Sequence, residues 1–205
     1  MSGSYFDDDL AGFFDELRRH NNKEWFDAHR DEWERVVRIP IERLLGEAQE
    51  QYRLGKVLRQ NRDVRFARDK SPYRTSAAMV AGLMYLRVSD DGLELGGGLY
   101  RPTREQLGAA RTVIDQRPHA AAALEKIFDD LEGKGYTITG PSLRTAPKGF
   151  PRDHPWIELL RLQSFAALRR LPLSASRDAI GATWAETEPL IRWIRKWVDS
   201  GANSL

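Results

Sequence analysis

The feature that most constrains the fold is an Asp-Asp-Gly step at residues 90–92, between two extended segments over 82–89 and 93–100. Asp-Gly between extended runs is a strong signal for a β-hairpin. A hairpin joins antiparallel strands, so we expect an antiparallel sheet in the middle of the chain. Residues 61–68 also alternate well enough to predict a strand, and residues 136–139 predict a short one.

Helical patterns precede this segment. Phe13, Phe14 and Leu17 form an apolar stripe at helical spacing. Asn21 is followed by Glu24 three residues later, which resembles a capping box and predicts the start of a second helix. A proline then predicts an end or a kink at residue 40, after which the helical pattern resumes.

Helical patterns also follow the hairpin. Thr103 and Gln106 have the spacing of a capping box, which predicts a helix over about 104–116. Pro118 and Pro155 each predict another helix start, and the second of these helices is expected to include Phe165. A last helix is expected to stop near residue 201.

The combined pattern predicts an α+β fold with a mainly antiparallel central sheet and helices packed from both the N-terminal and the C-terminal segments. The length suits one domain over 1–205. Within it we expect N-terminal helices over 9–52, a sheet region over 61–100, and C-terminal helices and a loop over 104–200.

Composition narrows the classes of function. The 205 residues include no cysteine, which excludes disulfides, thiol catalysis and thiolate metal sites. The start of the chain is acidic and lacks the pattern of a secretory signal, and no apolar run is long enough to span a bilayer. These features favour a cytoplasmic location without membrane contact. The formal net charge of +2 is not by itself typical of a nucleic-acid-binding protein.

Positive charge is concentrated between residues 59 and 75, where six basic residues face two acidic ones. As a strand, this segment would place Arg62 and Arg68 on one face and Asp63, Arg65 and Asp69 on the other, where an acid would flank the arginine on each side. A turn is expected after the strand, because a proline follows at position 72.

The function that we expect is a pocket for an anionic small molecule that bears phosphate or carboxylate. Arginine pairs with such groups through two parallel hydrogen bonds, and lysine adds a point charge. The expected ligand-binding residues are Arg62, Arg65, Lys70, Tyr73, Arg74, Tyr100 and Lys148. Asp69 and His154 are the candidates for proton transfer if the protein is an enzyme, which the sequence leaves open. No metal site and no particular cofactor is predicted.

Two alternatives use the same residues. A nucleic-acid-binding module could use the basic stretch to contact phosphates. A non-catalytic interaction or scaffold protein would instead use these charges as internal ion pairs. Neither the oligomeric state nor the identity of a ligand follows from the sequence.

Two further motifs have competing interpretations. The glycine triplet at 96–98 precedes a predicted helix and could lie against a phosphate, but glycines in a strand more often allow close packing of another segment. Asp153 is expected to cap the helix that begins near Pro155. His154 and Glu158 are then four residues apart on one helical face, a spacing that suits a proton-transfer pair better than a metal site.

Four segments resemble the domain-of-unknown-function family DUF2461, a group of bacterial and fungal proteins. They are FFDELRRHNNKEWFDAHR (13–30), RDVRFARDKSPYRT (62–75), LGGGLYRP (95–102) and APKGFPRDHPWIELLRLQSF (146–165). The resemblance implies no particular activity. It does suggest that the segments meet at one pocket, with Arg65, Lys70, Tyr100 and Lys148 converging there. Residues 77–84 depart from the tyrosine-rich pattern that the family leads us to expect, and only Tyr85 remains.

Overall fold

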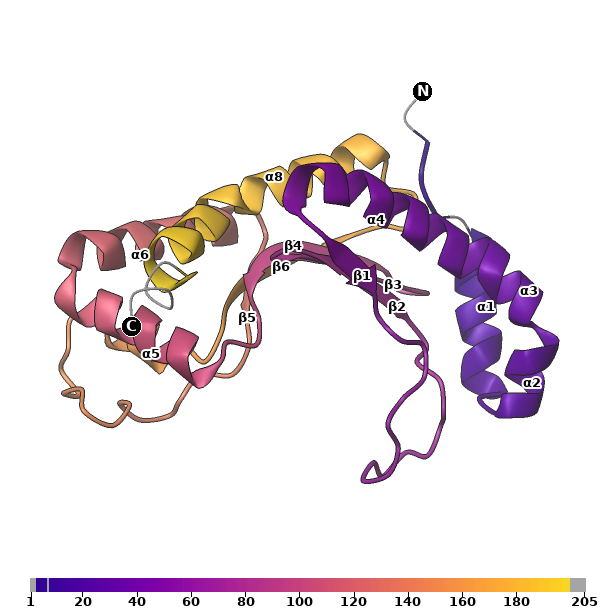
Figure 1. Ribbon diagram of the computed structural model, residues 1–205, viewed down its shortest axis with the longest axis horizontal. Coiled ribbons are helices and arrows are strands. Elements are labelled where there is room, and N and C mark those ends of the chain that lie inside the picture. Colours follow the sequence, from indigo (N-terminus) through magenta and orange to yellow (C-terminus); the bar gives the residue numbers. More distant parts are fainter. Residues whose placement is uncertain (1–2, 7, 200–205) are drawn as a thin grey trace. The chain divides into compact units, whose positions relative to one another are not determined.

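The hairpin is present as predicted. The computed structural model describes residues 3–6 and 8–199 (Figure 1). In it strand β3 (Met84–Ser89) ends immediately before Asp90, and strand β4 (Gly92–Leu99) begins immediately after Asp91. Gly92 adopts a φ of 116°, a conformation that glycine reaches without strain.

The strands form one six-stranded sheet in the order β1-β2-β3-β4-β6-β5. The remaining strands are β1 (Gly55–Val57), β2 (Ala77–Ala81), β5 (Thr137–Thr139) and β6 (Phe165–Leu171). Pairing is antiparallel, with Gly55 opposite Ala81 and Ala77 opposite Val88. Helices precede and follow the strands along the chain, so the α+β prediction is confirmed.

The described residues group into two compact units. The first runs up to Leu95 and includes Arg170–Ala182, and the second contains Gly96–Arg169 and the chain from Thr183 onwards. The chain first passes from one unit to the other inside β4, and it passes between them again inside β6 and between residues 182 and 183. The expectation of a single domain over 1–205 stays a prediction.

In the first unit, an N-terminal series of helices packs on the strands. The series comprises α1 (Asp8–Arg19), α2 (Lys23–Ala28), α3 (Arg30–Trp33), the π-helical turn η1 (Glu34–Arg38) and α4 (Ile39–Tyr52). Helix α4 contacts β1 and β2, and α1 contacts β3. The fully buried side chains Leu10, Phe14 and Leu17 come from α1, and Met79 and Leu86 come from the strands. The predicted apolar stripe of α1 is therefore its buried face.

The capping box predicted at Asn21 is wrong by one residue. Asn22 is the N-cap of α2, and its side chain accepts a hydrogen bond from the Trp25 amide at 2.9 Å. Asn21 is thereby left free to bond elsewhere. Pro40 lies in the first turn of α4, which follows the π-helical turn η1 directly, so the helical run does not end at this proline.

In the second unit, two predicted helix starts are confirmed. Thr103 and Gln106 form a complete capping box at the start of α5 (Arg104–Gln116), and α6 (Pro118–Gly133) begins at Pro118. Helix α5 contacts α6, and α6 contacts β5.

Strand β6 was not predicted. The prediction that the helix near Pro155 extends to Phe165 is wrong. Helix α7 (Ile157–Arg161) is short, and Phe165 begins β6. The glycine triplet explains how β6 fits. A Cβ atom on Gly96 would lie 2.0 Å from the Ala167 carbonyl oxygen, and one on Gly98 would lie 2.2 Å from that of Phe165. These glycines therefore allow another strand to pack closely, which is the second of the two interpretations that the sequence offered for the triplet.

The chain continues through α8 (Arg177–Ile194) and the π-helical turn η2 (Arg195–Asp199). The stop expected near residue 201 lies outside the described residues. Across residues 3–6 and 8–199, none of the helices combines the length and the apolar character that crossing a membrane requires.

Candidate functional site

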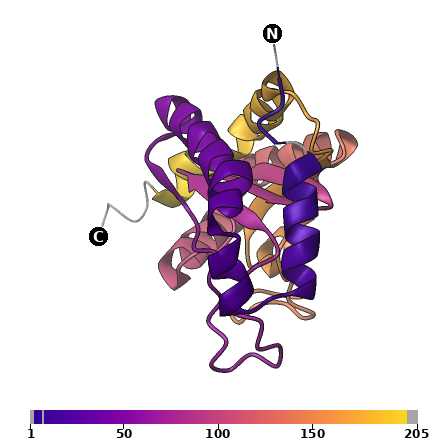
Figure 2. The same ribbon diagram turned by 90° about the vertical axis from the view of Figure 1, so that its right-hand side faces the viewer.

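The basic stretch forms an excursion between β1 and β2, defined here as residues 59–75, and not the predicted strand. Residues 61–68 are irregular apart from one bridge at residue 61. The base of the excursion is nevertheless held as a ladder, because the Arg62 amide donates to the Pro72 carbonyl at 2.8 Å and the Arg74 amide donates to the Gln60 carbonyl at 2.9 Å. In both views the excursion projects away from the strands of its own unit (Figures 1 and 2).

Local hydrogen bonds replace the two-faced strand at the tip. Asp63 accepts from the Arg65 amide at 3.2 Å and from the Arg65 guanidinium at 2.7 Å. That guanidinium lowers the pKa of the Asp63 carboxyl. Lys70 donates from Nζ to the Val64 carbonyl at 3.1 Å. Side chains that bond to nearby backbone in this way compete with strand pairing, which is why the alternation of residue types did not produce a strand.

The strand interpretation placed Asp69 beside Arg65. In the structure Asp69 pairs with Arg62 instead. It also accepts the Ser71 amide at 2.9 Å. Hydrogen bonds from the hydroxyl and amide of Ser71, followed by the one from Arg62, hold the pKa of Asp69 well below its ordinary value. Arg62 donates in addition to the Ser71 carbonyl at 3.2 Å. Asp69 is therefore an ionised anchor that fixes the position of the Arg62 guanidinium.

Asn21 attaches the excursion to the N-terminal helices. Its amide nitrogen donates to the Tyr73 carbonyl at 2.9 Å, and its amide oxygen accepts from the Tyr73 amide at 3.0 Å. Within the excursion, Pro72 and Arg74 make the backbone hydrogen bonds to the opposite segment. The amide and carbonyl of Tyr73, which lies between them, therefore point away from that segment. The side chain of Asn21 thus takes the place of a neighbouring strand. The Tyr73 ring is buried and stacks on Phe26 at 4.0 Å between centroids.

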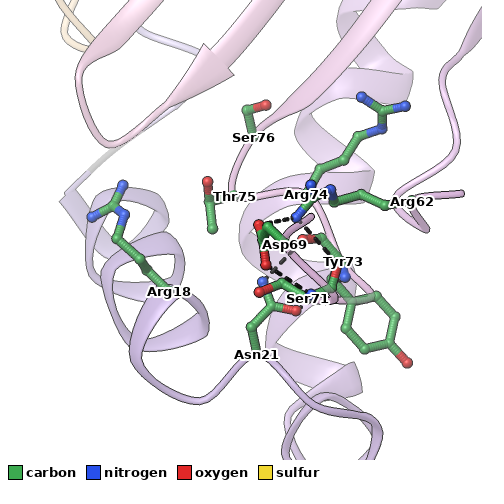
Figure 3. Close-up of a pocket in the computed structure, with 9 residues that line it drawn as sticks. All are labelled: Arg18, Asn21, Arg62, Asp69, Ser71, Tyr73, Arg74, Thr75 and Ser76. Carbon is green, nitrogen blue, oxygen red and sulfur yellow. Dashed lines mark hydrogen bonds and ion pairs between the residues drawn. The ribbon is translucent and has the colours of Figure 1, made fainter. Parts of the chain in front are cut away.

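A cavity of about 350 Å³ opens beside these contacts. Figure 3 shows the Asp69 carboxylate gathered with Asn21 and Ser71, while Arg18 approaches from α1 on the other side. The guanidinium of Arg74 lies apart from the Arg62–Asp69 pair (Figure 3). The lining residues are Arg18, Asn21, Arg62, Asp69, Ser71, Tyr73, Arg74, Thr75 and Ser76.

Three arginines and one aspartate make the lining positive, but the arginines differ in their partners. Arg18 donates to both carboxylate oxygens of Asp90 at 2.7 Å, so it is held by the hairpin turn. Arg62 is held by Asp69. Arg74 makes no ion pair with any residue that the structure describes, and its backbone is fixed by Gln60. The lining therefore combines two guanidinium groups that carboxylates hold in position with a third, that of Arg74, which has no ion-pair partner in the described part of the chain.

The sequence singled out four of the lining residues, namely Arg62, Asp69, Tyr73 and Arg74. Arg65 and Lys70 belong to the same excursion but do not line the cavity. The residues that the sequence reasoning missed are Arg18, Asn21, Ser71, Thr75 and Ser76. One signal existed for Asn21, because a helix start needs only one of two consecutive asparagines as its cap. No sequence pattern connects Arg18 to the excursion.

The other expected site residues lie in the second unit. Tyr100 is exposed beside Arg101, whose guanidinium lies 5.9 Å from the ring centroid, and Lys148 is exposed in the loop before α7. Their convergence with Arg65 and Lys70 stays a prediction.

His154 lies in a turn and not on a helix. Helix α7 begins at Ile157, so the predicted capping by Asp153 and the shared helical face with Glu158 are wrong. The Nδ1 atom of His154 accepts the Trp156 amide at 3.0 Å. That bond leaves Nε2 to carry the proton and donate it to Asp115 at 3.2 Å. Both ring nitrogens are therefore engaged in holding the turn to α5.

No cluster of three or more His, Asp or Glu side chains that could hold a metal ion occurs among the residues that the structure describes. The lining of the cavity in the first unit includes guanidinium, amide and hydroxyl groups, which are donors suited to an anion, together with the Asp69 carboxylate.

Comparison with protein families gives a match over most of the chain. The model of the family described as "Conserved hypothetical protein (DUF2461)" matches residues 9–193, which is most of the chain and includes every residue that lines the cavity. No curated protein and no solved structure matches.

Proposed function

We propose that this chain, which belongs to the DUF2461 family, binds an anionic small molecule bearing phosphate or carboxylate in the cavity of its first unit. The observation that carries the proposal is the lining itself, which includes three arginines, Arg18, Arg62 and Arg74, and one carboxylate, that of Asp69. Asp69 forms an ion pair with Arg62, so a guanidinium already balances the one carboxylate of the lining.

Preorganisation supports the proposal. Arg62 uses only its Nη1 group for Asp69 and the Ser71 carbonyl, and a guanidinium has five N–H donors. The remaining donors are available in a fixed orientation. Holding an arginine in place before binding reduces the side-chain entropy that a ligand must otherwise overcome.

Arg74 supplies a positive charge that no carboxylate of the described residues pairs with. Its guanidinium has no carboxylate partner in the described part of the chain. Its backbone is held by Gln60, because the Arg74 amide donates to the Gln60 carbonyl and the Arg74 carbonyl accepts from the Gln60 side-chain amide. Thr75 and Ser76 follow it and line the same cavity with hydroxyl groups. Arginine with neighbouring hydroxyls is a donor set that matches phosphate oxygens.

The proposal assigns binding and no reaction. A carboxylate whose pKa is held low, as that of Asp69 is, binds a proton weakly and is better suited to positioning Arg62 than to proton transfer. His154 belongs to the second unit and has both ring nitrogens engaged, so no step of the proposal depends on it.

Thermal unfolding in the presence of anions tests the proposal. Inorganic phosphate, phosphate monoesters and dicarboxylates would be titrated against wild type and Arg74→Gln. Losing a charged hydrogen-bond donor costs about 1.5–3 kcal/mol, so we expect Arg74→Gln to bind about 10-fold to 100-fold more weakly. At about 100 times the dissociation constant, the ligand should stabilise wild type by about 2.7 kcal/mol.

Arg59→Gln is the matched control. Arg59 lies exposed in the same excursion, and its replacement removes the same charge without touching the lining. If Arg59→Gln weakens binding as much as Arg74→Gln does, the attraction comes from general positive charge and the proposed cavity site is wrong. Absence of stabilisation of wild type by every anion in the series would also contradict the proposal.

A further inference from the structure

We propose that the tip of the excursion is a second binding site, for single-stranded nucleic acid, in which the Phe66 ring stacks on a base. The Phe66 side chain is 96% exposed, the highest exposure among the large hydrophobic residues that the structure describes. Exposing a phenylalanine forfeits the stabilisation that its burial would provide. Aromatic side chains, phenylalanine included, are enriched at the surfaces where proteins contact a partner.

The tip is held in shape around this ring. The Ala67 amide donates to the Val64 carbonyl at 3.3 Å, which closes a turn with Phe66 inside it. Lys70 donates from Nζ to the Val64 carbonyl at 3.1 Å and to the Arg65 carbonyl at 3.4 Å. Phe66 is therefore presented on an ordered turn, and a partner that stacks on it has little chain entropy to overcome.

The charges beside the ring select a partner rich in phosphate. Between residues 62 and 74 there are five basic residues and two acidic ones. Arg68 is exposed and makes no ion pair within the described residues, whereas Arg65 forms an ion pair with Asp63. An aromatic ring beside cationic side chains is the arrangement with which proteins hold single strands, through stacking on the bases and charge contacts with the backbone.

A single ring favours nucleic acid over a membrane surface. Phe66 is the only large exposed hydrophobic residue between residues 59 and 75, all of which the structure describes. Stable attachment to a bilayer requires a larger apolar group or a second anchoring group. Stacking needs only one ring face for each base, and every base offers one.

The test is fluorescence anisotropy of a labelled short oligothymidylate with the full chain at about 50 mM and about 200 mM salt. We expect binding at low salt that Phe66→Ala weakens at least about fivefold and Phe66→Tyr preserves, because tyrosine keeps the stacking face. Arg68→Gln should reduce the dependence of log affinity on log salt by about 0.7 if Arg68 contacts one phosphate. Because Phe66 is exposed, its replacement should leave the unfolding temperature unchanged.

Leu54→Ala is the control, since Leu54 is also a large exposed hydrophobic residue, at 87%, but lies outside the excursion. It should bind the oligonucleotide as wild type does. Equal affinity of wild type and Phe66→Ala overturns the proposal, as does the absence of binding at low salt. Cosedimentation with phosphatidylserine vesicles provides a further arm, and vesicle binding that depends on Phe66 without oligonucleotide binding would show that the tip contacts lipid instead. None of these variants changes a residue that lines the cavity, so the result does not depend on whether the cavity binds an anion.

Discussion

Replacing Asn21 by alanine should separate the excursion from the N-terminal helices. The Asn21 amide forms two hydrogen bonds, of 2.9 and 3.0 Å, with the backbone of Tyr73. Tyr73 is only 6% exposed, so its amide and carbonyl would lose their partners in a largely buried place. Each buried backbone group left without a partner costs about 1–3 kcal/mol. Because Asn21 itself is half-buried and water can partly replace it, we take the lower part of that range and expect about 2–4 kcal/mol in total.

The neighbouring asparagine provides the control. Asn22 is exposed and makes one capping bond with the Trp25 amide, so Asn22→Ala should cost about 1 kcal/mol. Urea unfolding of both variants, followed by tryptophan fluorescence, measures the two free energies. We expect the midpoint for Asn21→Ala to fall clearly below that for Asn22→Ala, with a similar slope. If Asn21→Ala destabilises no more than Asn22→Ala does, the view that Asn21 replaces a strand is wrong.

Gly98→Ala should destabilise the protein by about 3 kcal/mol or more, because its Cβ would lie 2.2 Å from the Phe165 carbonyl at a φ of 131°. Gly108→Ala, in α5 with no atom near the new Cβ, should instead stabilise by about 0.5–1 kcal/mol, and equal unfolding temperatures for the two would refute the packing argument. Asp69 has a lowered pKa in the folded state, so its contribution to stability is present above the unfolded pKa of about 3.9 and is lost as pH falls through the folded value. The difference in unfolding temperature between wild type and Asp69→Asn should therefore shrink at acid pH, and a difference that is constant with pH would contradict the assignment.

Local signals predicted those parts of the fold that depend on neighbouring residues. The hairpin around Asp90–Asp91 and the capping box of Thr103 with Gln106 each involve residues a few positions apart, and both are confirmed. Strand β6 was missed because Phe165 follows a helical run directly, and its pairing partners are distant in the sequence. A short apolar segment does not distinguish a strand from a buried helix by its periodicity.

The same distinction applies to the excursion. Its charge and its turn residues are evident in the sequence, but the pairing of its charges is not. Alternation suggested that Asp69 would face Arg65, whereas the turn at Ser71 brings Asp69 to Arg62. Once the backbone leaves the strand conformation, the two-residue period no longer determines which side chains meet.

The sequence by itself determined that the chain is an α+β protein of the DUF2461 family with its densest positive charge at residues 59–75. Only the tertiary structure decided which of those charges are paired, and it left Arg74 without an ion-pair partner among the described residues. It also joined Asn21 to Tyr73 and paired Arg18 with Asp90 at the same cavity. These contacts connect residues about 50 to 70 positions apart and depend on how helix α1 packs on the strands. Hydrogen bonds and ion pairs act over a few ångströms in space, and no local pattern in the chain records them.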